Sequence, residues 1–522
     1  MSSRVLVVAL SLLLAAPAAA EEGPRVVATA ERPVVPLLVG EPRAPLCRLV
    51  IRVEGEGEPP RLESVSLGGD LPPAVHDFRL MRGEIVPGSP AESIAAPTIE
   101  SGVLHVEGGA ALETGANVFW IVGAIGDDVD LLDRVALSIA EIGTSAGPVD
   151  VADPSPGVRQ RIGVALRRHG QDGVHTSRIP VLAATPKGTL LAAYDLRHRG
   201  TKDLQEDIDV GLSRSTDGGR TWEPVRTIMD MGEAEGLPQE QNGCGDPGIL
   251  VDDVTGRIYC FALWVHGKPG KHQWHDDGSE PGFEIGRTAQ FMVVHSDDDG
   301  VTWSEPENLT RSLKEESWWL LAPAPQAGFT RADGTLVMPV QGRFGNGPLD
   351  SFATIMTSVD RGATWSLGSF GYRGGNECQA AELADGRIML NVRSDKQRYR
   401  GVSVTADLGR TWAPHPTSDG VLEEPNCNGS LLACPTPSGE RLLLFANPLS
   451  QKERSHQTIR TSSDDGTTWP ESGRILLDEG RGRGYPSLAR VGPDRVGIVY
   501  EGSRADVVYQ AVSLSELEGL PR

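Results

Sequence analysis

The chain has 522 residues, of which 71 are acidic and 49 are basic, and its formal net charge is −22. This acidity excludes nucleic acid as an expected partner, because no basic stripe offsets the negative field. With 62 glycines, 38 prolines and no heptad or long amphipathic helical pattern, the composition favours a turn-rich, all-β protein.

Residues 1–20 have the pattern of a secretory signal. Arg4 precedes the apolar run 5–15, and the small residues 18–20 come just before two glutamates. This order of charge, apolar run and small-residue cleavage site predicts removal of the segment and a secreted or periplasmic product. No other run is long and apolar enough to span a membrane, so we expect no membrane span.

Residues 24–147 are expected to form a separate, smaller β domain, similar to a sandwich. They contain short β-rich segments at 47–53, 104–106 and 118–122, but no copy of the turn motif described below. This domain either binds glycan or braces the rest of the chain. The proline-rich residues that follow predict a linker over 148–160, and residues 161–522 form the second domain.

The second domain carries five copies of the pattern Ser/Thr-x-Asp-x-Gly-x-Thr-Trp. In such a sequence the Asp accepts hydrogen bonds from backbone N–H groups just ahead of it, and the Gly supplies a positive φ. The Thr and Trp are expected to begin a returning strand, with the Trp packed inward. The copies are STDGGRTW (215–222), SDDDGVTW (296–303), SVDRGATW (358–365), TADLGRTW (405–412) and SSDDGTTW (462–469).

The spacing of these turns is typical of propeller blades. Successive Asp residues lie 81, 62, 47 and 57 positions apart, and short apolar strands recur upstream of most copies, at 187–191, 333–337, 385–389 and 440–444. Residues 178–514 number 337, so six blades would average about 56 residues each. We therefore expect a six-bladed β-propeller. Each apolar strand is interpreted as the first of its blade.

Metal ions and cofactors are not expected. The Asp residues of the turns bond to their own backbone, which argues against calcium, and the sequence has no paired Cys-x-x-Cys or His spacing for zinc. The segment 266–275, with three His and a Trp, is interpreted as a polar loop. Six cysteines are too few to form the framework of so large a chain. The protein is expected to be a monomer.

The start of the second domain resembles a known family. Arg178 lies in a Ser-Arg-Ile-Pro sequence ahead of a strand, and the segments 194–197 (YDLR) and 202–212 (KDLQEDIDVGL) follow. An Arg-Ile-Pro start followed by these turns is similar to the secreted bacterial exo-sialidases (neuraminidases), glycoside hydrolases whose repeats are called Asp boxes or BNR repeats. The resemblance extends over residues 175–515 and implies the six-bladed catalytic propeller of that family.

The resemblance implies a clamp of three arginines for the carboxylate on the anomeric carbon of sialic acid. The matching residues are Arg178, Arg393 in LNVRS, and Arg454 in RSHQTIR. Guanidinium groups suit this task because each offers a planar fork of donors to a carboxylate, which an acidic protein must otherwise repel. Arg393 ends its strand at the position where Arg197 ends another, so we expect both at the same face of the propeller.

The family uses a tyrosine as nucleophile, and the matching residue is Tyr485 in RGYPS. A neutral phenol activated by a base avoids the repulsion that an anionic nucleophile meets at a centre already bearing a carboxylate. The implied base is Glu377, sixteen positions before Arg393, and Glu382 is the alternative because it lies near the same strand.

The implied general acid and base is Asp203, 25 residues after Arg178. Asp195, Asp207 and Asp209 are nearby alternatives. We expect Asp207 and Asp209 to belong to the next strand or its start.

Three further residues complete the set that the resemblance implies. Asp195 is expected to orient Arg197, which resembles a further contact to the substrate. Glu501 matches the carboxylate that supports the first arginine, Arg178.

The function implied is exo-α-sialidase activity: hydrolysis of terminal sialic acid from glycoproteins, glycolipids or oligosaccharides, with retention and a tyrosyl-enzyme intermediate. One alternative is a related enzyme that acts on another nonulosonic acid or transfers the sugar instead of hydrolysing it. The other is a non-catalytic Asp-box propeller that binds sialoglycans, since the turn motif alone carries no chemistry.

Overall fold

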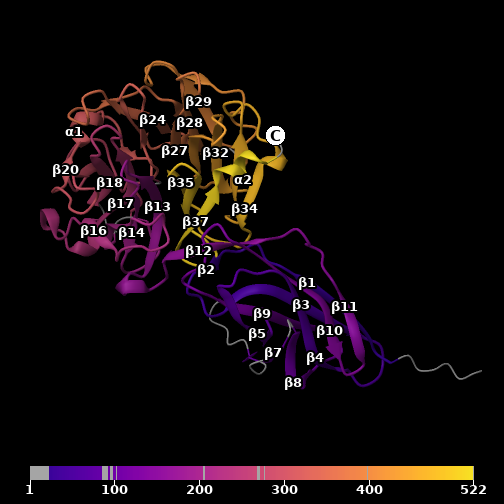
Figure 1. The fold of residues 1–522 in the computed structure, drawn as a ribbon. Helices are drawn as coiled ribbons and strands as arrows, with labels where there is room; N and C mark the ends of the chain where they lie inside the picture. The colour runs from indigo at the N-terminus through magenta and orange to yellow at the C-terminus, as the bar shows by residue number, and fades with distance from the viewer. Residues whose placement is uncertain are drawn as a thin grey trace, which may run out of the picture.

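The computed structural model describes residues 23–84, 92–93, 98–100, 103–203, 206–266, 271–274, 277–396 and 398–520. The expected signal segment 1–20 lies outside these residues. The described part is all-β, as expected, and its strands form a ring of sheets and an adjoining elongated body (Figure 1).

Five separate sheets follow one another around the ring in chain order, which makes it a β-propeller (Figure 1). Neighbouring strands within each sheet are antiparallel. The first two sheets consist of β13 (Thr176–Ala184), β14 (Leu190–Arg197), β15 (Ile208–Ser215) and β16 (Arg226–Met229), and of β17 (Asn242–Val251), β18 (Ile258–His266), β19 (Gln290–Ser296) and β20 (Glu307–Asn308). The third sheet consists of β21 (Leu320–Pro323), β22 (Phe329–Thr330), β23 (Leu336–Arg343), β24 (Ser351–Ser358), β25 (Ser366–Leu367) and β26 (Tyr372–Arg373). The last two consist of β27 (Gly375–Glu382), β28 (Ile388–Ser394), β29 (Gly401–Thr405) and β30 (Ala413–Pro414), and of β31 (Ser430–Pro435), β32 (Arg441–Pro448), β33 (Gln457–Ser462) and β34 (Arg474–Asp478).

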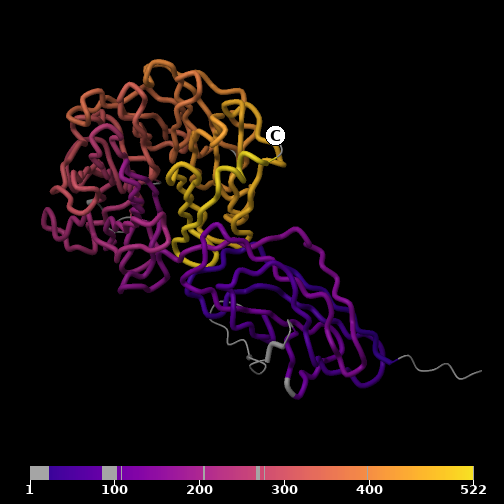
Figure 2. The backbone as a smooth tube through the Cα atoms, viewed as in Figure 1, coloured from indigo at the N-terminus to yellow at the C-terminus, as the bar shows by residue number. Residues whose placement is uncertain are grey.

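The last strands of the chain pair with the strand that enters the ring. β35 (Pro486–Val491), β36 (Arg495–Tyr500) and β37 (Val507–Ser513) are joined by β12 (Gln160–Arg167), and together they form one end of a 15-stranded sheet. Val164 of β12 pairs with Tyr509 of β37. In Figure 2 the yellow C-terminal strands lie against this incoming segment, at the junction between ring and elongated body.

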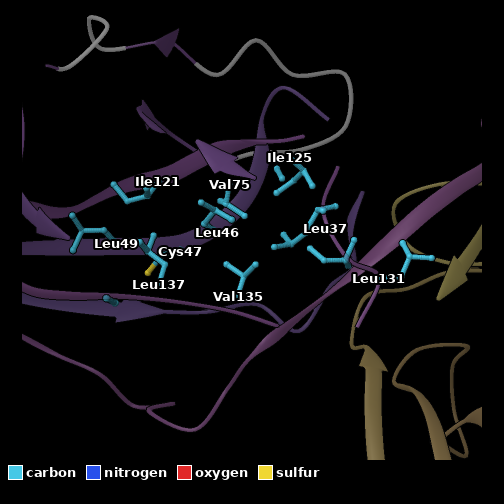
Figure 3. Close-up of a cluster of buried hydrophobic side chains, with 14 of the residues drawn as sticks. Leu37, Leu46, Cys47, Leu49, Val75, Ile121, Ile125, Leu131, Val135 and Leu137 are labelled. Atoms are coloured by element: carbon cyan, nitrogen blue, oxygen red, sulfur yellow. The ribbon is translucent and has the colours of Figure 1, made fainter. Parts of the chain in front are cut away.

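The rest of that sheet forms the elongated body. Its strands are β1 (Arg25–Glu31), β2 (Leu37–Leu38), β3 (Ala44–Glu54), β4 (Arg61–Asp70), β5 (Val75–Arg82), β6 (Glu92–Ser93), β7 (Thr98–Glu100), β8 (Val103–Ala111), β9 (Gly115–Ile125), β10 (Arg134–Thr144) and β11 (Gly147–Ala152). Figure 3 shows its apolar interior, where Leu49 of β3 and Ile121 of β9 lie across from Val135 and Leu137 of β10. All four side chains are fully or almost fully buried.

The expected linker over 148–160 is too long at its start. Residues 147–152 are strand β11, which pairs with β10 and with β1. Alternating exposed and half-buried residues let this proline-containing strand join the sheet, so irregular backbone is confined to residues 153–159.

Helices are short among the described residues. They are α1 (Thr310–Leu313), α2 (Leu514–Glu518) and the 3-10 turns η1 (Gln171–Gly173), η2 (Ala234–Gly236), η3 (Gln239–Gln241) and η4 (Glu471–Gly473). None of the helices in this part of the chain has the length and apolar character needed to cross a membrane.

The five Asp-box turns have the expected hydrogen bonds. In the second turn, Asp298 Oδ1 accepts from the backbone N–H of Thr302 at 2.8 Å, and Oδ2 accepts from the Thr302 hydroxyl at 2.5 Å. Gly300 has a φ of 79° and donates its N–H to Ser296 Oγ at 2.9 Å. The same pattern recurs in the other turns.

Two details of the blades differ from the expectation. The Thr and Trp of each turn precede the returning strand instead of beginning it; Trp222, for example, lies outside β16 and packs edge-on against Tyr509 at 5.4 Å. The apolar strands β14, β23, β28 and β32 are not the first strands of their sheets, because β13, β21, β27 and β31 precede them. A strand is expected at β13, after Arg178, whereas no repeated pattern marks β21, β27 and β31.

Replacing Asp298 with asparagine is expected to destabilise the protein at neutral pH. Hydrogen bonds from the Thr302 hydroxyl and backbone lower the pKa of Asp298 from 3.8 to about 2. A carboxyl whose folded pKa is lowered stabilises the fold above its unfolded pKa, and this contribution disappears as pH falls toward 2. Thermal unfolding should therefore show a Tm about 2 °C lower for Asp298→Asn at pH 7 and a smaller difference at pH 3. A difference that does not change with pH would contradict this account.

Candidate active site

One pocket of about 110 Å³ collects six of the residues selected from the sequence. They come from strands and connecting loops of four different sheets. They are Arg178, Asp203, Glu377, Arg393, Arg454 and Tyr485. A larger cavity of about 510 Å³ is lined mainly by apolar residues such as Leu182, Ala327 and Leu488, and it contains none of these six.

Glu501 holds Arg178 in place through two hydrogen bonds. Its Nε donates to Glu501 Oε1 at 2.8 Å and its Nη2 donates to Oε2 at 3.2 Å. A bulge in β13 follows Arg178, where Ile179 has a φ of 55° and donates its N–H to the same carboxylate at 2.9 Å. Glu501 also accepts the N–H of Tyr485 at 3.2 Å. This buried carboxylate therefore fixes the first arginine and the tyrosine together.

The buried Tyr485 and the partly buried Glu377 form a hydrogen-bonded pair beside Arg393. The phenol donates to Glu377 Oε1 at 2.5 Å, and Arg393 Nη1 donates to Glu377 Oε2 at 2.6 Å and to the phenolic oxygen at 2.9 Å. Burial, followed by the charge of Glu377, raises the pKa of Tyr485 well above its ordinary value, although Arg393 and Arg454 oppose this. The phenol is therefore neutral at neutral pH, with a carboxylate in place to take its proton.

The third arginine, Arg454, also lies beside the tyrosine ring. Arg454 Nη1 donates to the carbonyl of Arg483 at 3.1 Å and its Nη2 donates to the carbonyl of Asn426 at 2.8 Å. The guanidinium carbons of Arg178 and Arg454 lie 5.3 and 5.2 Å from the centre of the Tyr485 ring. Three cations thus surround one phenol, a geometry suited to a ligand that carries a carboxylate.

Asp203 lies on the loop between β14 and β15, at the rim of the pocket. Arg197 Nη1 donates to its Oδ1 at 2.5 Å, and Arg178 Nη1 is 3.5 Å from the same oxygen. The Asp203 side chain is 48% exposed; desolvation by the surrounding protein raises its pKa, but Arg197 and Arg178 outweigh this effect and lower the pKa overall. Asp203 is therefore ionised in the unliganded protein.

Asp195 is fully buried and accepts from Arg197 Nε at 3.0 Å and Nη2 at 2.7 Å. This position is the one expected for a residue that orients Arg197. Arg197 and Arg393 lie at the same end of the propeller, as predicted, since each contacts a residue that lines the pocket.

The alternative candidates for the base and for the acid, Glu382, Asp207 and Asp209, do not line the pocket. Glu382 pairs with Arg331 at 2.8 Å, at the opposite end of β27 from Glu377. Asp209 lies in β15 and Asp207 just before it, as expected, and Asp209 is 2.9 Å from His198 Nε2. His198, Asp207 and Asp209 are the one group of potential metal ligands among the described residues, and none of them lines the pocket.

Several lining residues were not selected from the sequence: Asp246, His272, Gln273, Trp274, Gln341 and Asn376. Burial and the nearby carboxylates of Asp195, Asp203 and Glu377 raise the pKa of Asp246 well above its ordinary value. Asp246 follows a Gly-Cys-Gly sequence and has a φ of 53°, but no local pattern marks it as a site residue. His272 to Trp274 belong to the segment interpreted as a polar loop, and that interpretation missed their position in the pocket.

A propeller whose pocket places three guanidinium groups around a hydrogen-bonded Tyr–Glu pair is suited to bind a carboxylate-bearing ligand beside a potential nucleophile. Residues 188–498 match the family described as "BNR repeat-like domain". A sialidase of Bacteroides fragilis (strain YCH46) is 39% identical over 442 residues, which cover 83% of this chain and 80% of that protein. The chain belongs to the sialidase family.

Two further comparisons agree. A sialidase of Micromonospora viridifaciens is 32% identical over 374 residues, which cover 68% of this chain and 54% of that protein. The solved structure of Hadza microbial sialidase Hz136 matches with a TM-score of 0.85 and 35% identity, over 94% of this chain and 99% of that chain. The likeness to Hz136 thus includes most of the elongated body as well as the propeller.

Proposed function

We propose that this protein is an exo-α-sialidase that hydrolyses terminal sialic acid from glycoconjugates with retention, through a covalent intermediate on Tyr485. The observation that carries the proposal is the convergence of Arg178, Arg393 and Arg454 on the Tyr485–Glu377 pair in one pocket. Membership of the sialidase family supports it.

Binding begins with the sugar carboxylate. Its charge is neutralised by the three guanidinium groups, which are already held in place by Glu501, Glu377 and backbone carbonyls. When the carboxylate of the substrate pairs with Arg178, the attraction that lowers the pKa of Asp203 weakens. Asp203 can then hold a proton, as a general acid must.

In the first chemical step the phenolic oxygen of Tyr485 attacks the anomeric carbon. Its proton passes to Glu377, to which it is already hydrogen-bonded at 2.5 Å. The bond between the anomeric carbon and the aglycone oxygen breaks, and Asp203 donates a proton to that oxygen. The products of this step are a tyrosyl glycoside and a free alcohol.

The second step reverses the roles. Asp203, now a carboxylate, takes a proton from water, whose oxygen attacks the anomeric carbon from the face that the aglycone left. The bond to Tyr485 breaks, and Glu377 returns the proton to the phenol. Two displacements give overall retention, and both carboxyl groups regain their starting state.

We also propose a six-bladed propeller with a separate N-terminal domain. β12, β35, β36 and β37 form the sixth blade, so that the N-terminal strand of the propeller closes the ring with its C-terminal strands. The strands from β1 to β11 form a sandwich-like domain over residues 24–152, and the propeller spans 160–520. The first 20 residues direct export to the periplasm or the exterior, and the enzyme acts as a monomer.

The test is to incubate the protein with a set of sialylated oligosaccharides and to identify the released sugar by mass spectrometry and NMR. Release of free sialic acid is the expected result. Appearance of the sugar on another acceptor would identify a transferase, and release only from substrates with another nonulosonic acid would change the substrate. No release from any member of the set would contradict the enzymatic proposal.

A further inference from the structure

Asn426 connects two of the three arginines, although it does not line the pocket. Its side-chain Oδ1 accepts from Arg393 Nε at 2.8 Å, and its main-chain carbonyl accepts from Arg454 Nη2 at 2.8 Å. These two arginines are 61 positions apart in the sequence and lie on different sheets or loops. A single residue therefore sets the distance and orientation of one guanidinium relative to the other.

The backbone at Asn426 is held in an unusual conformation. Its φ is 60°, in the left-handed region that asparagine tolerates better than most residues other than glycine. This conformation allows the side-chain oxygen and the carbonyl oxygen of one residue to face two arginines. Both the asparagine side chain and its left-handed backbone are therefore needed to contact Arg393 and Arg454.

A buried ion pair beneath the loop fixes this conformation. Glu424 and Arg400 are both fully buried, 3.5 Å apart. Glu424 accepts the N–H of Cys427 at 2.9 Å and the N–H of Ser394, next to Arg393, at 3.1 Å. Arg400 donates to the carbonyl of Cys427 at 2.8 Å. The loop that carries Asn426 and the strand that carries Arg393 are therefore tied to the same carboxylate.

Arg393 also controls the nucleophile. Its Nη1 contacts both Glu377 and the Tyr485 hydroxyl, and its Nε is taken by Asn426, which leaves Nη2 with no protein acceptor among the described residues. With Nε anchored, rotation of the guanidinium is blocked, so Nη2 stays available to a ligand while Nη1 stays on the Tyr–Glu pair. Loss of the hydrogen bond to Nε would therefore disturb both ligand binding by Nη2 and the contact of Nη1 with the Tyr485–Glu377 pair.

We propose that Asn426 is a positioning residue of this enzyme, which holds Arg393 and Arg454 in the mutual orientation that binds the sugar carboxylate and aligns the Tyr485–Glu377 pair. The inference rests on the proposed sialidase function. It adds a residue that touches neither substrate nor nucleophile and that acts through the two arginines.

Two substitutions separate its geometric and electrostatic roles. Asn426→Gly keeps the left-handed backbone and the carbonyl that accepts from Arg454, and removes only the acceptor of Arg393. Asn426→Asp keeps the backbone and an acceptor oxygen but adds a negative charge beside the clamp. The control is Asp465→Gly, since Asp465 has a similar φ of 55° in an Asp-box turn and lines no part of the pocket.

The measurements are kcat and KM on a fluorogenic aryl sialoside, inhibition by free N-acetylneuraminic acid, and Tm. For Asn426→Gly, we expect kcat/KM to fall about tenfold and the inhibition constant to rise, because the partly buried guanidinium of Arg393 loses a hydrogen-bond partner. For Asn426→Asp, we expect kcat to recover to within about threefold of the parent while KM stays raised, because the new carboxylate competes with that of the substrate. Asp465→Gly should match the parent in all three kinetic values.

Kinetic values for Asn426→Gly within twofold of the parent would overturn the proposal, and so would equal losses of kcat in the Gly and Asp variants. If Asn426→Gly does not yield folded protein, Asn426→Asp decides alone: a raised KM at nearly parental kcat supports the proposal and an unchanged KM contradicts it. A parent protein that neither turns over the sialoside nor binds the free sugar would instead refute the proposed function, and this inference with it.

Discussion

Replacing Tyr485 with phenylalanine is expected to lower turnover by about three orders of magnitude or more, with little change in the affinity for free sialic acid. The substitution removes the nucleophilic oxygen and the hydrogen bonds to Glu377 and Arg393, but it keeps the ring that contacts Arg178 and Arg454. Steady-state kinetics on an aryl sialoside measures turnover, and inhibition by the free sugar reports the arginine clamp separately.

The matched control is Tyr500→Phe. Tyr500 is also fully buried and lies next to Glu501, and its hydroxyl donates to Gln510 at 3.1 Å, away from the pocket. This variant should retain nearly parental turnover. Near-normal release of sialic acid by Tyr485→Phe would show that another group attacks the anomeric carbon.

Replacing Asp203 with alanine should reduce activity on natural linkages far more than on aryl sialosides. A sugar alkoxide is a poor leaving group and needs the proton that Asp203 supplies, whereas an activated phenolate leaves with little help. We expect a loss of about 10²- to 10⁴-fold in kcat/KM on a sialyl-oligosaccharide and a much smaller loss on an activated aryl sialoside. The two substrates are compared under the same conditions.

Asp207→Asn is the control for this test, because Asp207 is on the same loop, was an alternative acid, and does not line the pocket. It should keep nearly parental activity on both substrates. Equal losses on both substrates for Asp203→Ala would argue that Asp203 binds or orients the substrate instead of protonating the leaving group. A selective loss in Asp207→Asn would move the acid role to that residue.

The Asp-box turns were predictable because each is a local structure. Ser, Asp, Gly and Thr of one turn bond to one another within seven residues, as Asp298 does with Ser296 and Thr302, so the sequence pattern itself contains the interactions. The repeat of such turns then indicates repeated sheets. The strands that precede β14 and β28 are less marked, because bulges in β13 and β27 interrupt the regular strand pattern.

The pocket was predictable only in part. Arg178 and Tyr485 stand in short motifs that the sialidase resemblance makes recognisable. Asp246 reaches the pocket from an irregular part of strand β17 and Trp274 from a loop, neither within a repeated pattern, and their positions depend on how separate sheets pack. The role of Asn426 is harder to predict from the sequence, because it depends on a left-handed backbone and on two arginines that are distant in the sequence.

The central claim is that Tyr485 forms a covalent bond to the sugar within the arginine clamp. The most direct test is to treat the protein with 2,3-difluorosialic acid, whose 3-fluorine slows both displacements and whose 2-fluoride leaves readily, and to map the adduct by peptide mass spectrometry. The account predicts a sialyl adduct on Tyr485 that is absent in Tyr485→Phe. An adduct on Glu377 or on another residue, with none on Tyr485, would contradict it.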